Sequence, residues 1–339
     1  MVLTVWEQPS AAAVAPRVSD FLCDLPGPVA IHLHGHDRSR CRVLVTLLHG
    51  NEPSGLEAVH QWLRSGKQPA VDTVFIIASV AAARTEPLFY FRQLPGKRDL
   101  NRCFSPPYTD NEGLLAQAIL QHIDQCQPEA VIDIHNTSGS SHGFAVATSD
   151  TPAARCLVGL FVDYLIITDL QLGSLMEQPL ACPVVTIEAG GALDDAADFV
   201  ASAGLGRYLM APHVFAEERP LTLFQHPYRL ELLQHSRIDY ADHGLRDRDV
   251  TIRKDIERYN FAALEAGAAL GWLGEEGLTH LQVVAGDCSH PVEEFFQVRD
   301  GILSARSRLH LFMATTRADI AASDCLFYFV TEPVPVSES

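Results

Sequence analysis

Up to Pro212, the chain alternates short apolar runs with longer stretches in which apolar residues recur at helical spacing. The apolar runs predict buried strands at Val43–Leu48, Val71–Val80, Ala130–Ile134 and Val184–Ile187. The longer stretches predict helices at Ser54–Arg64, Glu112–Cys126, Pro152–Val162 and Leu193–Met210. This alternation is typical of an α/β domain with a mixed or mostly parallel sheet that is covered by helices on both faces.

The pattern changes between Pro212 and Pro220, after which the segments are shorter and more strand-like. The strand-like segments are Leu221–Phe224, Leu281–Val284, Ile302–Phe312 and Cys325–Val330. We therefore expect an α/β domain over residues 1–215 and a smaller β-rich domain over residues 216–339. A chain of 339 residues is long enough for both.

The composition argues against several classes of function. A formal net charge of −17 and a pI near 5.2 oppose binding to nucleic acids and to anionic membranes. No stretch has the apolar length of a membrane-spanning helix, and the first residues lack the basic start of a signal peptide, so we expect a cytoplasmic protein. The eight cysteines are widely spread without a CxxC pair and are expected to be reduced. The sequence leaves a homo-oligomer open.

Three polar clusters lie at the ends of predicted buried strands. They read HGNE at 49–52, DIHN at 133–136 and EAGG at 188–191. In an open α/β sheet, ligands bind at the carboxyl ends of the strands. We therefore expect the three clusters to meet at one edge of the sheet.

Each cluster taken alone has an ordinary structural explanation. Glu52 suits the start of a helix, His135 can be a hydrogen-bonded histidine at a strand end, and Glu188 can cap the following helix. Taken together, two neutral histidines and one carboxylate, with an open position, are the ligand set of catalytic zinc sites. His49, Glu52 and His135 are the candidate ligands of one zinc ion per chain. Asp133 is the candidate partner that orients the imidazole of His135.

Glu188 is a candidate catalytic base. It closes an apolar strand beside a run of small residues, which is an unusual place for a structural glutamate. In a poorly solvated cleft its pKa would rise, as a proton shuttle at neutral pH requires.

Arginines gather between Arg84 and Arg102 in an otherwise acidic chain, and this segment ends in DLNR at 99–102. Arginine side chains suit a substrate carboxylate or a developing oxyanion. A solvated basic loop would give the same pattern.

Other histidines carry weaker signals. His142 follows a strand end and is a candidate substrate contact, because loops at that position often carry binding groups. His32, His34 and His36 alternate along a predicted hairpin over Ile31–Asp37. We interpret these three as a solvated face rather than a second metal site.

Four motifs occur in order along the chain: HGNExxG (His49–Gly55), DLNRxF (Asp99–Phe104), DxHN (Asp133–Asn136) and IEAG (Ile187–Gly190). The combination resembles the succinylglutamate desuccinylase/aspartoacylase family, relatives of the zinc carboxypeptidases, and covers Val43 to about Met210. The resemblance implies a zinc carboxypeptidase-like mixed sheet flanked by helices. It also implies the zinc ligands and the general base named above.

The resemblance further implies how a substrate is held. Asn101 and Arg102 match the pair that grips a substrate carboxylate, and Arg92 is the candidate for the arginine that polarises the scissile carbonyl. Gln178 stands where the family's best-known members carry another arginine for a substrate carboxylate.

The implied activity is hydrolysis of the linear amide bond of an N-acylated amino acid, or of a similar small amine with a free carboxylate. Two alternatives stay open: a zinc carboxypeptidase acting on short peptides, and a metal-binding module without turnover. Glu188 argues against the second, because binding a metal does not require a base.

Overall fold

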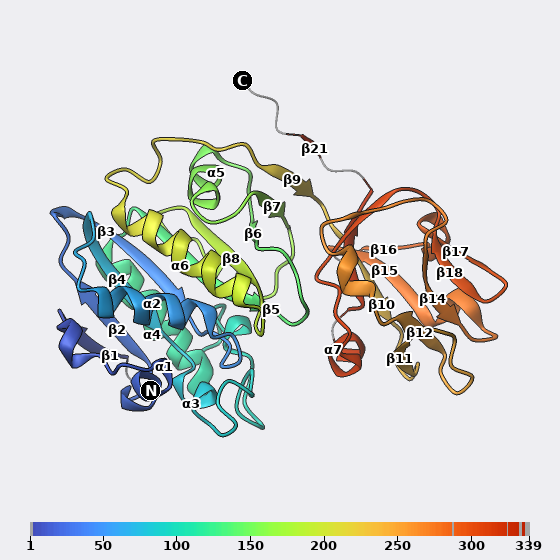
Figure 1. Ribbon diagram of the computed structural model, residues 1–339, viewed down its shortest axis with the longest axis horizontal. Coiled ribbons are helices and arrows are strands. Elements are labelled where there is room, and N and C mark those ends of the chain that lie inside the picture. Colours follow the sequence, from blue (N-terminus) through green and yellow to red (C-terminus); the bar gives the residue numbers. More distant parts are fainter. Residues whose placement is uncertain (1–2, 287, 324, 332–333, 336–339) are drawn as a thin grey trace. The chain divides into compact units, whose positions relative to one another are not determined.

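The computed structural model describes residues 3–286, 288–323, 325–331 and 334–335. The chain forms two compact units (Figure 1). The first comprises residues 1–136, 143–165 and 170–221, and the second comprises residues 137–142, 166–169 and 222–339.

The first unit is built on a large mixed sheet with the strand order β1-β2-β4-β3-β5-β8-β6-β7. The strands are β1 (Thr4–Glu7), β2 (Val29–Leu33), β3 (Asp37–Thr46), β4 (Val71–Ile77), β5 (Ala130–Thr137), β6 (Phe144–Ala147), β7 (Tyr164–Ile167) and β8 (Val184–Gly191). β3 pairs in parallel with β4 and β5, whereas β2 is antiparallel to β4 and β6 is antiparallel to β8. The predicted mixed α/β sheet is therefore confirmed.

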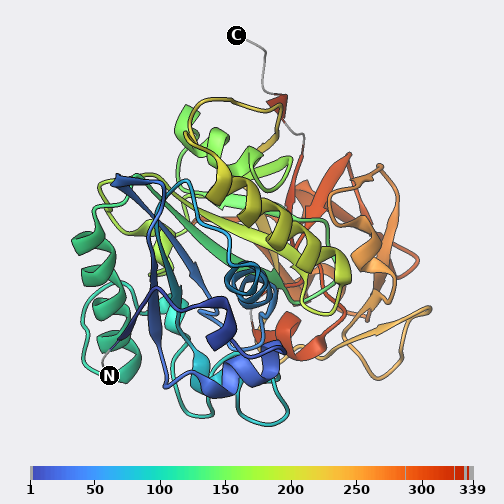
Figure 2. The same ribbon diagram turned by 60° about the vertical axis from the view of Figure 1, so that its left-hand side comes forward.

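Helices cover both faces of this sheet (Figure 2). α4 (Asn111–Cys126) packs Leu115 and Ile119 against Val43 and Val45 of β3. α2 (Ser54–Ser65) lies on the opposite face, where Gly55 approaches the side chain of Thr46, and α6 (Asp195–Met210) packs beside it. The remaining helical segments are η1 (Ala11–Ala13), α1 (Val18–Asp24), α3 (Val80–Ala83), η2 (Leu100–Arg102), α5 (Pro152–Gly159) and η3 (Leu175–Glu177).

The second unit is β-rich, as predicted. One of its sheets has the order β13-β19-β20-β10-β15-β16 and another has the order β11-β12-β14-β18-β17. Its strands are β9 (Thr222–Gln225), β10 (Tyr228–Leu232), β11 (Ile238–Ala241), β12 (Val250–Arg253), β13 (Ala263–Leu264), β14 (Ala269–Leu273), β15 (Leu281–Ala285), β16 (Cys288–His290), β17 (Phe296–Arg299), β18 (Ile302–Ala305), β19 (Leu309–Phe312), β20 (Phe327–Val330) and β21 (Val334–Pro335). The helical segments are η4 (Ile256–Tyr259), η5 (Gly277–His280), η6 (Val292–Glu294) and α7 (Ala318–Ser323). Leu230, Leu303 and Phe329 are among the buried residues of its core.

One local prediction was wrong. The hairpin expected over Ile31–Asp37 does not form, because β4 lies between β2 and β3 and pairs with both. His32 consequently lies in β2, while His34 and His36 lie in the connection that follows. The segment Ile302–Phe312 forms two strands, β18 and β19, which belong to different sheets.

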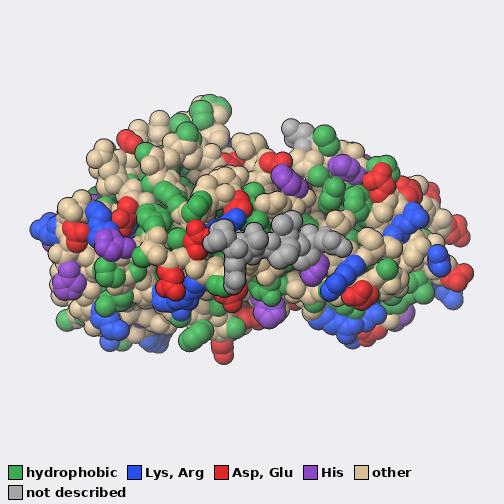
Figure 3. All heavy atoms as spheres, turned by 90° about the horizontal axis from the view of Figure 1, so that it is seen from above, with side chains coloured by type: hydrophobic (Ala, Val, Ile, Leu, Met, Phe, Trp, Pro, Cys, Tyr) green, Lys and Arg blue, Asp and Glu red, His purple; other side chains and the backbone are tan. Residues whose placement is uncertain are grey.

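Surface charges of both signs are intermixed on the face seen in Figure 3. Many charged side chains of the described residues are paired; for example, Arg38 lies 3.7 Å from Asp72 and Arg98 lies 2.6 Å from Asp110. The eight cysteines are free thiols. Among the described residues, no helix is both long enough and apolar enough to cross a membrane.

Candidate metal and catalytic site

The polar clusters come from three neighbouring strands, because β5 lies between β3 and β8 in the sheet. His49 and Glu52 belong to the connection between β3 and α2. His135 and Glu188 lie within β5 and β8, since these strands extend to Thr137 and Gly191, beyond their predicted ends. The fold therefore brings together residues that are far apart in sequence.

The three candidate ligands point their donor atoms at one another. His49 Nδ1 lies 2.8 Å from Glu52 Oε1, and His135 Nδ1 lies 2.7 Å from Glu52 Oε2. The two Nδ1 atoms are 3.2 Å apart, and all three residues are buried. A cation among these atoms would take up both nitrogen lone pairs and the carboxylate charge, so the donor set fits a metal ion of the zinc type.

The second ring nitrogen of each imidazole, Nε2, contacts a carboxylate. His49 Nε2 lies 2.9 Å from Asp99 Oδ1, and His135 Nε2 lies 2.8 Å from Asp133 Oδ2. When Nε2 carries the proton and donates it to these carboxylates, the lone pair of each Nδ1 faces the centre of the cluster. The sequence analysis anticipated the contact of Asp133 but not that of Asp99, which the start of the DLNR motif could have suggested.

The charges of the cluster perturb one another strongly. Burial would raise the pKa of Glu52, but the two imidazoles hold it well below its usual range. Burial would lower the pKa of His135, but Asp133 and Glu52 outweigh it and raise that pKa well above the usual value. The raised pKa means that the imidazole of His135 holds its second proton tightly. A metal ion that binds to Nδ1 must displace this proton, so metal affinity should fall at low pH.

Glu188 has the properties expected of a proton shuttle. Its Oε2 atom is buried and has no hydrogen-bond partner among the described residues. Burial raises the pKa of Glu188 to about 7, although His135, His49 and Arg92 act against the rise. Helix capping does not explain this residue, since Asp194 occupies the N-cap position of α6.

Arg92 lies beside the ligands. Its Nη1 is 3.3 Å from Glu52 Oε1, and its Nη2 is 2.9 Å from Asp99 Oδ2 and 2.7 Å from His49 Nε2. His49 Nε2 can donate to Asp99 only when it carries a proton, and it can accept from Arg92 only when it does not, so the two hydrogen bonds exclude each other. In the tautomer that turns the lone pair of Nδ1 towards a metal, Nε2 donates to Asp99, and a donor of Arg92 is released for another oxygen atom.

Asn101 and Arg102 follow Asp99 in η2. Asn101 is buried, and its Oδ1 accepts a hydrogen bond from the backbone N–H of Leu175 at 3.1 Å. Arg102 is exposed, and its Nη1 donates to the carbonyl of Asn101 at 3.0 Å. The guanidinium of Arg102 keeps donors that can bind an anion.

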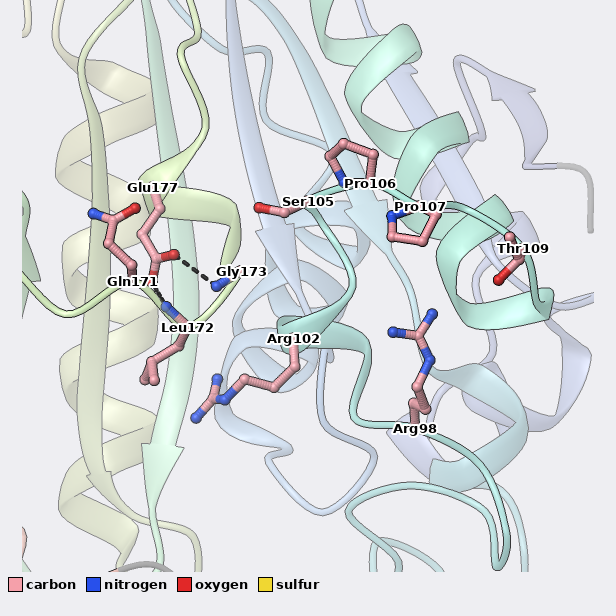
Figure 4. A pocket seen from close by; sticks show the side chains of 10 residues that line it. All are labelled: Arg98, Arg102, Ser105, Pro106, Pro107, Thr109, Gln171, Leu172, Gly173 and Glu177. Atoms are coloured by element: carbon pink, nitrogen blue, oxygen red, sulfur yellow. Dashed lines mark hydrogen bonds between the residues drawn. The ribbon is translucent and has the colours of Figure 1, made fainter. Parts of the chain in front are cut away.

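A pocket of about 400 Å³ adjoins Arg102 (Figure 4). Arg98 and Glu177 also line it, but Glu177 accepts hydrogen bonds from the backbone N–H groups of Leu172 and Gly173, at 3.0 and 2.7 Å. Both Arg98 Nε and Nη2 lie 2.6 Å from Asp110. Arg102 is thus the more available of the two arginines in this pocket, which contains none of the three candidate metal ligands.

His142 belongs to the second unit, so its predicted contact with a substrate stays a prediction. Gln178 donates its side-chain N–H to the carbonyl of Ser174 at 2.9 Å.

Two local features shape the connection that carries His49. Leu47 has φ of 57°, a left-handed conformation that turns the chain at the end of β3 and costs about 1–2 kcal/mol for a residue other than glycine. A Cβ on Gly50 would come within 2.6 Å of the carbonyl oxygen of Phe91 and 2.7 Å of Ala83 N. Glycine is therefore needed at position 50 for close approach rather than for an unusual φ.

The side chain of Asn136 links several elements of the site through hydrogen bonds. Its side chain accepts from Ser54 N at 3.1 Å and donates to the Ser54 hydroxyl at 2.9 Å and to the carbonyl of Gly190 at 3.0 Å. It thereby connects the start of α2 with β5 and β8. The sequence placed Asn136 in a motif without revealing this role.

Residues 42–197 match the sequence model of the succinylglutamate desuccinylase/aspartoacylase catalytic domain, which confirms the resemblance inferred from the four motifs in this part of the chain. No curated protein sequence matches the chain.

Several solved structures have the same fold, including the following three. Succinylglutamate desuccinylase from Chromobacterium violaceum has 14% identity and a TM-score of 0.57, with 91% of this chain and 89% of that chain covered. A succinylglutamate desuccinylase/aspartoacylase from Rhodobacter sphaeroides has 13% identity and a TM-score of 0.59, with 91% and 88% covered. The ectoine utilization protein EutE (DoeB) from Ruegeria pomeroyi has 15% identity and a TM-score of 0.54, with 88% and 86% covered.

Proposed function

We propose that the protein is a zinc-dependent amidohydrolase that cleaves the linear amide bond of an N-acylated amino acid or a similar small amine with a free carboxylate. The observation that carries the proposal is the convergence of His49, Glu52 and His135 on one point, with Glu188 within their electrostatic reach. A binding module would not need a buried carboxyl oxygen without a partner, whereas a hydrolase needs such a group as its base.

His49 Nδ1, His135 Nδ1 and the carboxylate of Glu52 would hold the zinc ion. Bound zinc would polarise a carbonyl group and lower the pKa of a water molecule to about 7. Asp99 and Asp133 would keep the Nε2 proton on each imidazole, and so keep the Nδ1 lone pairs turned inward.

Glu188 would move the proton. Its Oε2 atom would accept a proton from the attacking water and then deliver it to the nitrogen of the leaving amine. The amide C–N bond breaks as a C–O bond forms, so the products are a carboxylate and a free amine. A pKa near neutrality suits both halves of this transfer.

Arginine and amide donors would position the substrate. The guanidinium of Arg92, released from His49 as described above, would stabilise the negative charge that develops on the carbonyl oxygen. The free donors of Arg102 and the side-chain amide of Asn101 would bind the substrate carboxylate.

Metal analysis tests the ligand assignment. His49→Ala and His135→Ala should each lose the zinc of this site and all measurable deacylase activity, because loss of one of three protein ligands cripples affinity. His34→Ala is a matched control in the same unit and should behave as wild type. Deacylase activity that persists in the His49 and His135 variants would refute the assignment.

A substrate panel separates the proposed activity from a peptidase. The purified protein should hydrolyse N-acyl amino acids faster than short peptides that end in the same residue. Faster cleavage of the peptides would instead identify a carboxypeptidase.

A further inference from the structure

A second group of metal-binding side chains lies on the α4 face of the large sheet. His32 in β2 and His122 and Cys126 in α4 place one ligand atom each within 4.8 Å of one another. His122 and Cys126 are four residues apart, so their side chains leave α4 on the same face. None of these residues belongs to the site described above.

The two imidazoles meet through the same ring nitrogen. His32 Nε2 lies 2.9 Å from His122 Nε2, and the rings are tilted by 75°. The other nitrogen of His32, Nδ1, lies 3.9 Å from a carboxylate oxygen of Glu7. Histidine ligands of metals typically turn one nitrogen to the ion and donate from the other to a carboxylate; Glu7 lies on that side of His32 but beyond hydrogen-bond distance.

Cys41 in β3 lies next to this group of three and is the candidate for a fourth donor. Its thiol donates to the carbonyl of Arg42 at 3.6 Å and interacts electrostatically with the thiol of Cys126. A pocket of about 430 Å³ is lined by His32, Cys41, His122 and Cys126 together. Two histidines and two cysteines are a ligand set of tetrahedral structural zinc sites, which leave no position open for catalysis.

We propose that His32, Cys41, His122 and Cys126 form a second, structural binding site for zinc or a chemically similar thiophilic dication. Binding transfers the two thiol protons to solvent, and the two thiolates balance the charge of the ion. The ion joins α4 to β2 and β3, two strands that are not neighbours because β4 separates them. Its role is to fix the helix on the sheet.

Cobalt titration of the reduced, metal-depleted full-length protein tests this proposal. Thiolate ligands give cobalt a charge-transfer absorption that the His-Glu-His site cannot produce, because that site has no sulfur. The absorption should appear in the wild type and in His49→Ala, and should be absent in Cys126→Ser. In His122→Ala and His32→Ala, cobalt affinity should fall by more than about a hundredfold.

His34→Ala is the matched control. His34 lines the same pocket and lies 4.0 Å from Asp72, but it is not a proposed ligand, so this variant should keep the absorption. Zinc should also raise the thermal stability of His49→Ala but not that of His49→Ala combined with His122→Ala. His122→Ala alone should retain deacylase activity, which separates this proposal from the proposed function.

Two results would overturn the proposal. One is a reduced wild-type protein that takes up cobalt without the thiolate-to-cobalt absorption. The other is an absorption that survives unchanged in both His122→Ala and His32→Ala.

Discussion

Glu188 combines a buried Oε2 atom that has no hydrogen-bond partner among the described residues with a pKa raised to about 7. Leaving a buried polar atom without a partner costs stability, about 1–3 kcal/mol in typical proteins. Such a cost is acceptable where the atom must exchange a proton with a substrate. The residue is therefore best explained by chemistry rather than by packing.

Replacing Glu188 by glutamine should leave the zinc content unchanged and lower kcat by at least about a hundredfold, the usual effect of removing a general base. The amide has nearly the same shape but cannot accept the proton. Steady-state kinetics and metal analysis on the same preparation measure both quantities. Near-normal kcat in this variant would place the base elsewhere.

The same substitution should change how stability depends on pH in the metal-free protein. Burial raises the pKa of Glu188 from 4.5 to about 7, so the folded state binds the proton more tightly than the unfolded state. The stability that this proton contributes is complete below pH 4.5 and is lost as the pH rises through 7. Glutamine does not titrate, so the variant does not lose this contribution as the pH rises. The unfolding free energy of Glu188→Gln minus that of the wild type should therefore increase between pH 4.5 and 8, by a few kcal/mol at most. Urea unfolding at several pH values measures this difference, and a difference that does not change with pH would contradict the raised pKa.

The sequence predicted candidate site residues where polar groups follow predicted buried strands, as at His49, His135 and Glu188. The contact between Asp99 and His49 joins residues 50 positions apart, and Asn136 bonds to Gly190 across 54 positions. A local pattern cannot reveal such contacts, because they depend on which strands become neighbours.

At the scale of elements, Arg42 fixes the C-terminal end of α6 against β3. Its side chain is fully buried and its Nε lies 2.6 Å from Glu129 Oε1. Its Nη1 donates to the carbonyls of Tyr208 and Ala211, at 2.6 and 2.8 Å. These carbonyls end a helix and have no partner within it, so the cation satisfies them and the negative end of the helix dipole.

Replacing Arg42 by leucine should destabilise the protein by about 3–5 kcal/mol, because Glu129 and the helix carbonyls would lose a buried cation. Combining it with Glu129→Leu should recover part of this loss, since the second change removes a carboxylate that would keep Arg40 as a cationic partner, at 3.2 Å, but would lose Arg42. Thermal or urea unfolding of the two single variants and the double variant measures the coupling. Strictly additive effects would mean that the ion pair contributes nothing of its own.

The elements themselves were predicted closely from apolar periodicity, as for α2, which begins at Ser54 as expected. The pairing of the strands in the sheet was not predicted. β2 and β3 are separated by three residues in sequence, yet each pairs with β4, which begins at Val71. The spacing of side chains predicts a strand, whereas its partner is chosen by the packing of the whole sheet.

At the scale of the molecule, the net charge of −17 acts on every substrate that approaches the site. A negative field disfavours anionic substrates and favours cationic ones over distances of about a Debye length, roughly 8 Å at physiological ionic strength. An enzyme for doubly negative substrates needs local cations to overcome this field. The number of available arginines is therefore decisive for substrate choice.

The resemblance implies that Gln178 stands in place of an arginine for a second substrate carboxylate, and the two arginines that could substitute for it, Arg98 and Arg155, are engaged elsewhere. Arg98 is held by Asp110 and Arg155 by Asp150, each through two hydrogen bonds of 2.6–2.7 Å. We therefore expect substrates with one carboxylate near the scissile amide, bound by Arg102 and Asn101. Esterifying that carboxylate should weaken binding by about 1.5–3 kcal/mol, as for a lost hydrogen bond to a charged group.

An additional carboxylate should bring no advantage, so N-acetylaspartate and N-succinylglutamate should be no better substrates than N-acetyl amino acids with neutral or basic side chains. The measurement is kcat/KM across this series, repeated at low and high salt. Any advantage of basic over acidic side chains should shrink with added salt, because screening weakens the field of the protein. A preference of about a hundredfold or more for either dicarboxylate, equivalent to some 2.7 kcal/mol, would require a cationic group in the position that Gln178 leaves neutral.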